Sequence, residues 1–538
     1  MNTILFHPEP DDIRSAAQIL RRGGLLGIPT ETVYGLGANA LDEEAVAHIF
    51  QAKGRPQDNP LILHVPEVSW LDRYCRDIPA AAYRLAERFW PGPLTMILPR
   101  RDIVPLRTTG GLDTVGVRCP RHPVTLAIIR EAGVPVAAPS GNTSGRPSPT
   151  SAAHMLEDMD GKIDGIMDGG PCDVGVESTI IDLTVTPPRL LRPGGLPLEE
   201  LRAVLGEVAV DKALTGLLDA GEQPRAPGMK YRHYAPQAPV TVVTGRPEAS
   251  ARRIRALLSD TAGVICFDEY APLFAGHSIH RLGPAADKAA QARHVFDALR
   301  TFDGSGVTEI FAQCPEEGGL GLAVANRLKK AAGFHLVDAD RPILIGLTGG
   351  SGAGKTSALA ALEELGGTVL DCDAVYHEML RTDEGLRGAI TEAFGPVFTP
   401  EGALDRQKLG NRVFSDPAAL ERLNTIIYAH LPPELLRRAA GQTLVGLDAI
   451  NLVESGLGDL CRCTVAVLAP AEDRVRRIMA RDGISRDYAR LRIAAQKDDG
   501  FYREHCSHIL ENTCADAAQF QAQARIFFRT LLREIDQI

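Results

Sequence analysis

The segment "GLTGGSGAGKTS", about two-thirds of the way along the chain, has the residue types of a phosphate-binding loop. Four residues separate Gly349 from the triplet Gly354, Lys355 and Thr356, and the apolar run "PILI" precedes them. Glycines let backbone N–H groups surround phosphate oxygens, and a helix that starts after them adds positive potential. We expect Lys355 to hold the β- and γ-phosphates of ATP and Thr356 to place its hydroxyl on Mg²⁺. The predicted ATP-binding residues of this loop are Gly352, Ala353, Gly354, Lys355, Thr356 and Ser357.

An acidic pair follows the next apolar run, in "GGTVLDCDAVYHEML". Asp371 or Asp373, at the end of a strand near the phosphate loop, could accept a hydroxyl proton or orient Mg²⁺. Either aspartate could instead cap a helix or lie in solvent at the end of the strand. The loop and the pair together predict phosphoryl transfer, and they leave the acceptor open.

The segments that follow narrow the choice of acceptor. In order they are "LDRQKLGNRVFSDPAALERLN", "LVESGLGDLCRCTVAVLAP", "EDRVRRIMARDGIS", "LRIAAQ" and "HILENT". Residues 342–538 thus resemble the dephospho-coenzyme A kinase family. The resemblance implies a P-loop fold like that of nucleoside monophosphate kinases, with transfer from ATP to the ribose 3′-hydroxyl of dephospho-coenzyme A. It makes Asp373, Lys355 and Arg481 the catalytic residues, with Arg481 on a lid over ATP. The stretch "RVRRIMARD" could equally be a solvated basic helix face.

This segment departs from the family pattern on the acceptor side. Asn451 interrupts the usual Pro-Leu-Leu-Phe/Val-Glu run, Tyr428 stands where a His-Pro pair begins, and Tyr502 replaces a lysine. The expected activity is a kinase. The alternative is a domain that binds ATP as a sensor or serves as a structural appendage.

The first third of the chain has a second cluster of cations and hydroxyl groups. Lys53 precedes a Gly-Arg-Pro turn that contains Arg55, and Asn59 and His64 follow along what we expect to be the same extended run. Such a set suits a polyphosphate. "APSGNTSG" offers hydroxyl groups among glycines, which is typical of an anion-binding backbone nest and also of an ordinary loop.

Taken with "PTETVYGLGANA", "WPGPLTMIL", "VGVRCPRHP" and "VESTIIDLT", this cluster closely resembles the threonylcarbamoyl-AMP synthase family of the YrdC-like fold. "APGMKYRHYAP" and "EEGGLGLAVANRLKKAAG" extend the resemblance to about residue 338, as in the two-domain form of that enzyme. The resemblance implies that threonine takes up CO₂ or bicarbonate as a carbamate, which attacks the α-phosphorus of ATP and releases pyrophosphate. The carbamate is unstable in water, so the site must be enclosed.

By motif position, the resemblance implies two sets of binding residues. The threonine set is Thr32, His64, Arg118, Ala138 and Ser178. The ATP set is Lys53, Arg55, Asn59, Thr114, Ser140, Ser148, Arg192 and Tyr234. The planar fork of Arg118 suits a carboxylate. No general base is evident, so positioning and charge neutralisation, with Mg²⁺, are expected to carry catalysis at this site.

These residues must be positioned by several α/β domains. We expect a YrdC-like domain at 1–215, a linker at 216–238, a small open-sheet domain at 239–338 and the P-loop domain at 342–538. Strands are predicted at "GLDTVGVRCP", "ESTIIDLT", "VTVVTG", "GVICF" and "EIFAQ", and helices at "DEEAVAHIFQAK" and "AAAYRLAERFW". The linker carries Lys230, Arg232, His233 and Tyr234, and we predict that it folds over the first site.

Composition limits the remaining possibilities. With 538 residues, 44% hydrophobic and 23% charged, the chain is typical of multidomain globular proteins. A net charge of −10 and 5% aromatic residues argue against stable nucleic-acid binding, although an RNA-binding first domain is a weaker alternative. Ten scattered cysteines, no secretory signal and no membrane span predict a cytoplasmic protein. The expected partners are ATP, L-threonine, bicarbonate, dephospho-coenzyme A and the proteins that transfer threonylcarbamoyl to tRNA.

Overall fold

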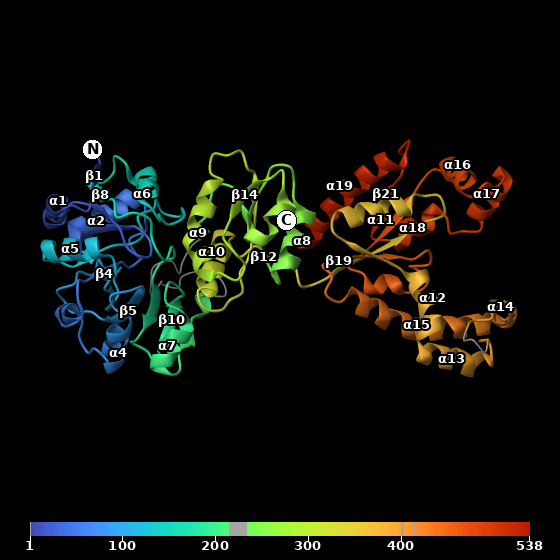
Figure 1. Ribbon diagram of the computed structural model, residues 1–538, viewed down its shortest axis with the longest axis horizontal. Coiled ribbons are helices and arrows are strands. Elements are labelled where there is room, and N and C mark those ends of the chain that lie inside the picture. Colours follow the sequence, from blue (N-terminus) through green and yellow to red (C-terminus); the bar gives the residue numbers. More distant parts are fainter. Residues whose placement is uncertain (1, 215–233, 400–402, 414–415) are drawn as a thin grey trace. The chain divides into compact units, whose positions relative to one another are not determined.

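The computed structural model describes residues 2–214, 234–399, 403–413 and 416–538. The chain divides into two compact units, Met1–Ala251 with Leu258–Val337, and Arg252–Leu257 with Asp338–Ile538. The first unit contains two sheets and the second unit one, all accompanied by helices (Figure 1). The predicted α/β class is therefore confirmed. Within the described ranges, no helix has the length and apolar character needed to cross a membrane.

The first sheet has 11 strands in the order β1-β8-β2-β3-β7-β4-β6-β5-β9-β10-β11 and mixes parallel and antiparallel pairs. Its strands are β1 (Ile4–Phe6), β2 (Leu26–Ile28), β3 (Gly35–Asn39), β4 (Ile62–His64), β5 (Leu94–Pro99), β6 (Thr114–Arg118), β7 (Val136–Ala137), β8 (Gly165–Met167), β9 (Thr179–Asp182), β10 (Arg189–Arg192) and β11 (Ala209–Val210). Its helices are α1 (Pro10–Arg21), α2 (Glu43–Lys53), α3 (Leu71–Tyr74), α4 (Ala80–Phe89), α5 (Pro123–Ala132), α6 (Ala152–Met159) and α7 (Leu198–Leu205), with short 3-10 turns at Val68–Trp70 and Lys212–Leu214.

Helix α2 has clear start and stop signals. The side chain of Asp42 accepts hydrogen bonds from the backbone N–H groups of Glu44 and Ala45, and Gly54 ends the helix with φ of 62°. The helix therefore ends on Lys53, and a turn leads to β4. This corrects the expectation of one extended run from Lys53 to His64: the glycine breaks the run, and only its last three residues form a strand.

The second sheet has five strands in the order β14-β13-β15-β12-β16, and β12 to β15 pair in parallel. The strands are β12 (Val240–Thr244), β13 (Ala262–Cys266), β14 (Ser278–Arg281), β15 (Glu309–Gln313) and β16 (Leu336–Asp338). The helices are α8 (Pro247–Leu257), α9 (Lys288–Thr301) and α10 (Gly321–Ala331), with a 3-10 turn at Asp268–Phe274. The three predicted strands are present as β12, β13 and β15, whereas β14 and β16 have polar ends that the apolar pattern misses.

The first two sheets share a hydrophobic cluster. Val33 and Val176 from the first sheet's loops pack with Tyr234 and with Phe296 of α9 and Leu328 of α10. Helices α9 and α10 therefore face the loops of the first sheet. Side chains from the second sheet's domain can reach those loops.

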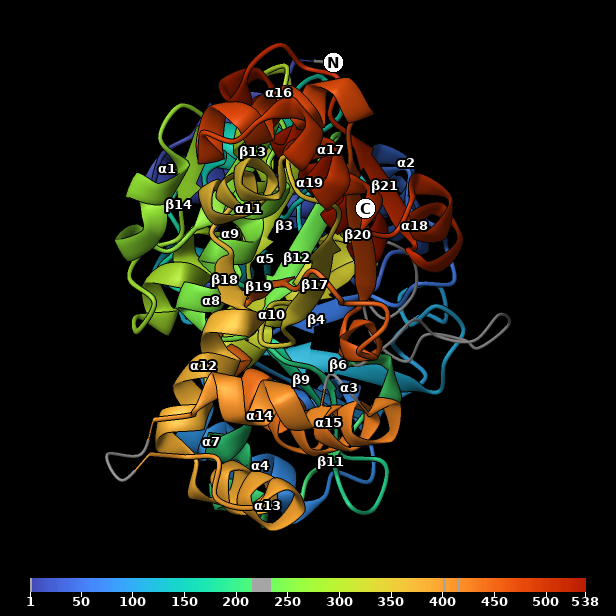
Figure 2. The same cartoon turned by 90° about the vertical axis from the view of Figure 1, so that its right-hand side faces the viewer.

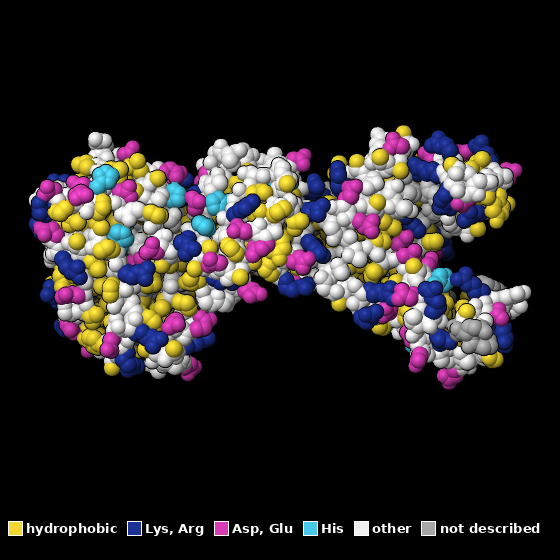
Figure 3. Space-filling view, in the orientation of Figure 1, with side chains coloured by type: hydrophobic (Ala, Val, Ile, Leu, Met, Phe, Trp, Pro, Cys, Tyr) yellow, Lys and Arg dark blue, Asp and Glu magenta, His cyan; other side chains and the backbone are white. Residues whose placement is uncertain are grey.

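The second unit has a parallel sheet in the order β18-β19-β17-β20-β21. Its strands are β17 (Ile343–Thr348), β18 (Thr368–Asp371), β19 (Leu444–Asp448), β20 (Cys463–Leu468) and β21 (His508–Glu511). Its helices are α11 (Lys355–Glu364), α12 (Cys372–Thr382), α13 (Glu384–Phe394), α14 (Arg406–Val413), α15 (Pro417–Ala439), α16 (Ala471–Asp482), α17 (Arg486–Ala494), α18 (Asp499–His505) and α19 (Ala517–Asp536), with a 3-10 turn at Leu457–Leu460. Helices α13 to α15 gather at one end of this unit and α16 and α17 at the other (Figures 1 and 2), and a wide hollow separates the two ends in Figure 3.

Candidate active sites

A pocket in the first unit brings together most of the residues predicted to bind threonine and ATP. It is bounded by loops at the ends of β2, β4, β6, β7, β9 and β10. The predicted residues that line it are Thr32, Lys53, Arg55, His64, Arg118, Ala138, Ser140, Ser178, Arg192 and Tyr234. The two predicted sets therefore share one pocket.

Three predicted residues do not line this pocket. Thr114 starts β6, and Arg118 ends it, so about 13 Å of strand separates Thr114 from the pocket end. Ser148 lies behind the wall, where its hydroxyl donates to Glu177 Oε1 at 2.7 Å. Asn59 is buried in the turn that follows Arg55, away from the lining. Direct contact with ATP remains a prediction for all three.

Arg118 is held by a carboxylate that sequence reasoning missed. Arg118 Nη2 lies 2.8 Å from Glu31 Oε1, and both side chains are at most 5% exposed. Burial raises the pKa of Glu31, but the charge and hydrogen bond of Arg118 outweigh it and lower the pKa below its ordinary value. Burial, with the charge of Arg118 adding to it, lowers the pKa of His64 to about 3. The imidazole is thus neutral at physiological pH.

A second carboxylate supports the opposite wall. Glu177 lines the pocket, and although burial raises its pKa, Arg327 and Arg192 lower it to about 2. Arg192 donates from Nε and Nη2 to the carbonyl oxygen of Ser178 at 3.1 and 2.9 Å. Burial lowers the pKa of Arg192 to about 10, so the guanidinium is still charged at neutral pH.

Lys53, predicted as a phosphate ligand, lines the pocket, and its contact with phosphate remains a prediction. Its ammonium is almost fully buried and donates to the carbonyl oxygens of Ser140 and Asn142. Burial lowers its pKa well below the ordinary value, with the charge of Arg55 contributing. Lys53 therefore fixes the loop that carries Ser140, and its donors are engaged by that loop.

The loop "APSGNTSG" forms part of the pocket as predicted from its glycines and hydroxyl groups. Ser140, Ser144 and Gly145 line the pocket, and Thr143 does not. Asn142, which the sequence pattern did not single out, also lines it.

The predicted lid is only partly within the described ranges. Lys230, Arg232 and His233 lie outside the described residues. Tyr234 lines the pocket, where its ring lies 5.1 Å from that of Phe296 on α9. Burial raises the pKa of Tyr234 to about 12, so its phenol is a neutral donor. The part of the predicted lid that is described thus borders the pocket.

The glycine-rich segment of the second unit forms a turn between β17 and α11. Gly349 has φ of 132°, and a Cβ there would lie 2.3 Å from the carbonyl oxygen of Val467, so only glycine fits. Helix α11 begins on Lys355, whose Nζ lies 3.4 Å from Asp448 Oδ1. Thr356 and Ser357 follow in the first turn of α11. The turn has the architecture that the sequence predicts for a phosphate-binding loop.

Carboxylates collect at the same edge of this parallel sheet. Asp371 ends β18 and pairs in register with Asp448, which ends β19. The side chain of Asp371 caps α12 by accepting from Ala374 N at 2.9 Å, and Asp373 is exposed in the first turn. Burial raises the pKa of Asp448, and Asp371 and Asp373 add to this while Lys355 opposes it. Asp448 was missed, although "LVGLD" has the same apolar run ending in aspartate as "TVLD".

The basic helix α16 contacts the loop through other arginines than the predicted one. Arg474 Nε donates to Ser351 O at 3.0 Å, and Arg477 Nη1 donates to Gly352 O at 3.2 Å. Arg481 is 59% exposed and pairs with Asp482 at 2.6 Å. Lys and Arg side chains gather over α16 and α17 in Figure 3. The structure therefore does not bring Arg481 to the loop, and its catalytic role remains a prediction.

The departures on the acceptor side are partly in contact with one another. Asn451 Nδ2 donates to the hydroxyl of Tyr428 at 3.4 Å. Tyr502 is buried in a small apolar cluster with Ala466 and Leu468. Tyr428 and Asn451 replace two family residues as a hydrogen-bonded pair, whereas Tyr502 serves packing.

Three family models match the chain. The family described as telomere recombination (Sua5, YciO and YrdC) matches residues 18–194, and the threonylcarbamoyl-AMP synthase C-terminal domain matches 196–333. The dephospho-CoA kinase family matches residues 343–517.

Individual relatives agree with these models. A threonylcarbamoyl-AMP synthase of Pyrococcus abyssi is 51% identical over 331 residues, which cover 60% of this chain and 95% of the relative. The crystal structure of P. abyssi Sua5 complexed with L-threonine is 49% identical with a TM-score of 0.59, covering 63% of this chain and 99% of that one. A dephospho-CoA kinase of Dehalococcoides mccartyi is 34% identical over 177 residues, covering 32% of this chain and 89% of the relative. The chain therefore belongs to the threonylcarbamoyl-AMP synthase family in its N-terminal part and to the dephospho-CoA kinase family in its C-terminal part.

Proposed function

We propose that this chain is a bifunctional enzyme with two separate ATP sites. The first unit forms threonylcarbamoyl-AMP from L-threonine, bicarbonate or CO₂, and ATP. The second unit transfers the γ-phosphoryl group of ATP to the 3′-hydroxyl of dephospho-coenzyme A. The observation that carries the proposal is the pairing of a buried, cation-lined pocket in one unit with a glycine turn and Lys355 in the other.

In the first pocket, three guanidinium groups supply fixed positive charge, two of them buried and that of Arg55 half-buried. Arg55, Arg118 and Arg192 all line it. Threonine would bind beside Arg118 and the neutral His64, and the triphosphate along Arg55 and Arg192. The carbamate oxygen forms a bond to the α-phosphorus, and the bond to the pyrophosphate oxygen breaks. Preorganised cations stabilise the charge that develops, and the enclosing walls exclude water.

In the second unit, the turn and the strand-end carboxylates have separate tasks. Lys355 would bind the β- and γ-phosphates, while Asp373 would accept the proton of the attacking 3′-hydroxyl. The exposed position of Asp373 in the first turn of α12 leaves it accessible to an acceptor. Arg474 and Arg477 hold the carbonyl side of the turn and so aim its N–H groups inward.

The residues of this second site fit Mg²⁺. Among the described residues no three His, Cys, Asp or Glu side chains form a ready metal cage. Mg²⁺ in kinases is held by one or two protein oxygens together with phosphates and water, so a cage is not required. The hydroxyl of Thr356 and the carboxylate of Asp448 are the protein oxygens available, and Mg²⁺ would neutralise phosphate charge there.

The test is product analysis of the full chain by mass spectrometry, with ATP, threonine, bicarbonate and dephospho-coenzyme A. Lys355→Ala should abolish coenzyme A formation and leave threonylcarbamoyl-AMP formation intact, and Arg55→Ala should do the reverse. Lys408→Ala and Arg22→Ala, on exposed surfaces, are the matched controls. ATP binding by the second unit without coenzyme A formation would favour a sensor or appendage, a reading motivated by the Tyr428–Asn451 pair.

The product of the first site would be used by proteins that transfer threonylcarbamoyl to tRNA. We place both reactions in the cytoplasm. All ten cysteines are free, which suits a reducing compartment.

A further inference from the structure

One arginine of the second sheet's domain reaches the synthase pocket from behind. Arg327 lies on α10 and is fully buried. Its Nε donates to Glu177 Oε2 at 2.8 Å, and its Nη1 donates to the carbonyl oxygen of Pro193 at 2.8 Å. A single guanidinium therefore fastens two segments of the first sheet's domain.

Those two segments carry pocket-lining residues, Ser178 from the predicted threonine set and Arg192 from the predicted ATP set. Glu177 directly precedes Ser178, and Pro193 directly follows Arg192. Arg192 itself donates to the carbonyl oxygen of Ser178, so the same two strand ends are joined twice. The planar fork of arginine suits such a double attachment, which a lysine ammonium reproduces only in charge.

Arg327 also contacts the described end of the predicted lid. Its guanidinium lies 5.7 Å from the centre of the Tyr234 ring. Glu177, Arg192 and Tyr234 all line the pocket, whereas Arg327 stands one layer behind them.

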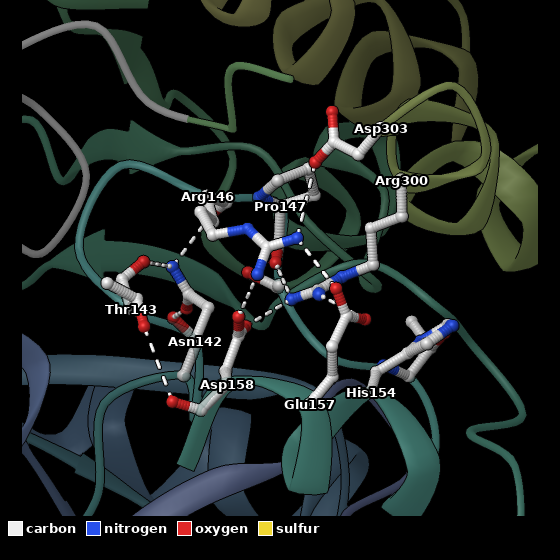
Figure 4. A network of polar contacts seen from close by, with 12 residues as sticks. Asn142, Thr143, Arg146, Pro147, His154, Glu157, Asp158, Arg300 and Asp303 are labelled. Atoms are coloured by element: carbon white, nitrogen blue, oxygen red, sulfur yellow. Dashed lines mark hydrogen bonds and ion pairs between the residues drawn. The ribbon is translucent and has the colours of Figure 1, made fainter. Parts of the chain in front are cut away.

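A second buried arginine from the same domain provides a comparison. Arg300, on α9, donates to Asp158 Oδ2 at 2.6 Å, and it also donates to the carbonyl oxygen of Pro147. It belongs to the network of Figure 4, in which Arg146 and Asp303 join the same two domains. Its hydrogen-bond partners Pro147, Asp158 and Glu157 do not line the pocket. Arg300 therefore has the burial and the interface location of Arg327, but none of its own hydrogen-bond partners lines the pocket.

We propose that Arg327 is a positioning residue of the synthase site, supplied by the C-terminal domain of the synthase part. It holds Glu177 and, through Glu177 and Pro193, the pair Ser178 and Arg192. Without it, Glu177 keeps Arg192 as its nearest cation and draws that guanidinium away from Ser178 and from the triphosphate. The inference rests on the synthase reaction of the proposed function.

The test compares Arg327→Met and Arg327→Lys with Arg300→Met and Arg300→Lys in the full chain. Threonylcarbamoyl-AMP formation is measured by mass spectrometry while ATP and threonine are varied in turn. We expect Arg327→Met to raise the KM for ATP at least tenfold, because the unpaired carboxylate of Glu177 acts on the charge of Arg192. The KM for threonine should rise less than threefold, because the hydroxyl of Ser178 carries no charge. The KM for ATP of Arg327→Lys should fall between those of the wild-type chain and Arg327→Met. The Arg300 variants should lower the thermal midpoint about as much as the Arg327 variants do, but they should change the KM for ATP less than twofold.

A double-mutant cycle with Glu177→Gln tests whether Arg327 acts through that carboxylate. If it does, Arg327→Met costs much less in kcat/KM for ATP when Glu177 is already Gln, because no uncompensated carboxylate remains. Equal KM shifts for both substrates, equal effects of the Arg300 variants, or additive effects in the cycle would overturn the inference. A wild-type chain that forms no threonylcarbamoyl-AMP would refute the proposed function and this inference with it.

Discussion

Replacing Lys53 by methionine is a direct test of how the synthase pocket is held together. Methionine keeps the unbranched apolar stem and removes the ammonium that donates to Ser140 O and Asn142 O. Both acceptors belong to the loop that lines the pocket. The substitution should therefore lower stability and loosen the loop at the same time.

The size of the effect follows from the lost donors. A buried polar group without a partner costs about 1–3 kcal/mol, so two carbonyls cost about 2–6 kcal/mol. The ammonium is itself expensive to bury, as its strongly lowered pKa indicates, and its removal offsets part of that cost. We expect a net loss of about 2 kcal/mol. With a denaturant slope of about 2 kcal/mol per molar, the urea midpoint falls by about 1 M.

Tryptophan fluorescence isolates this effect from the rest of a multidomain chain. The two tryptophans, Trp70 and Trp90, both lie in the core of the first sheet's domain. Lys162→Met is the matched control, because Lys162 is exposed and its ammonium donates to one carbonyl. Its free energy of unfolding should change by less than about 0.5 kcal/mol. The KM for ATP of Lys53→Met in threonylcarbamoyl-AMP formation should rise about tenfold. An unchanged midpoint together with an unchanged KM would refute this account of Lys53.

Three further outcomes are expected. Asp448→Asn should reduce kcat for coenzyme A formation at least about 100-fold. It should raise the thermal midpoint of the second unit, because a half-buried carboxylate that is repelled by Asp371 and Asp373 is removed; a fall in the midpoint would contradict this. Arg477→Ala should weaken ATP binding to the second unit in calorimetry more than Arg481→Ala does, since Arg481 is exposed and paired with its neighbour; the reverse order would restore the predicted lid role. His64 has a pKa of about 3 in the folded state against about 6.5 unfolded, so its contribution to stability is complete above pH 6.5 and is lost as pH falls toward 3. His64→Asn should therefore flatten the loss of first-unit stability between pH 6.5 and 4.5 in urea titrations followed by tryptophan fluorescence, and an equal slope in both proteins would show that His64 is not buried in the neutral form.

Many residues of both sites could be predicted from the sequence, because they belong to local motifs with a recurrent backbone conformation. The glycine turn before Lys355 could be assigned from spacing alone, since a strand, a glycine turn and a helix are local features. Asp448 could have been found by the same rule, because it too ends an apolar strand run at the phosphate edge of a parallel sheet.

The partners of the predicted residues were harder to find. Glu31 and Glu177 stand next to Thr32 and Ser178 in the sequence. Nothing local shows that Glu31 pairs with Arg118 at the end of β6, or Glu177 with Arg327 on α10. Arg327 comes from about 150 residues farther along the chain, on a helix whose pattern indicates only core packing. Such pairings depend on how strands and domains are placed in three dimensions, which residue spacing does not encode.

The two proposed ATP sites would neutralise phosphate charge by different groups, and this difference explains why the synthase pocket involves residues from more of the chain. The glycine turn offers neutral backbone N–H groups, which cost little to bury and which one strand and one helix can hold. The synthase pocket offers charged side chains, and a buried charge is costly unless a counter-charge and hydrogen bonds accompany it. Arg118 forms an ion pair with Glu31, and the charge of Glu177 acts on Arg192. Glu177 in turn forms an ion pair with Arg327, which lies on α10 of the second sheet's domain. On this reasoning the C-terminal domain of the synthase part is a structural requirement of the charge arrangement in the first pocket.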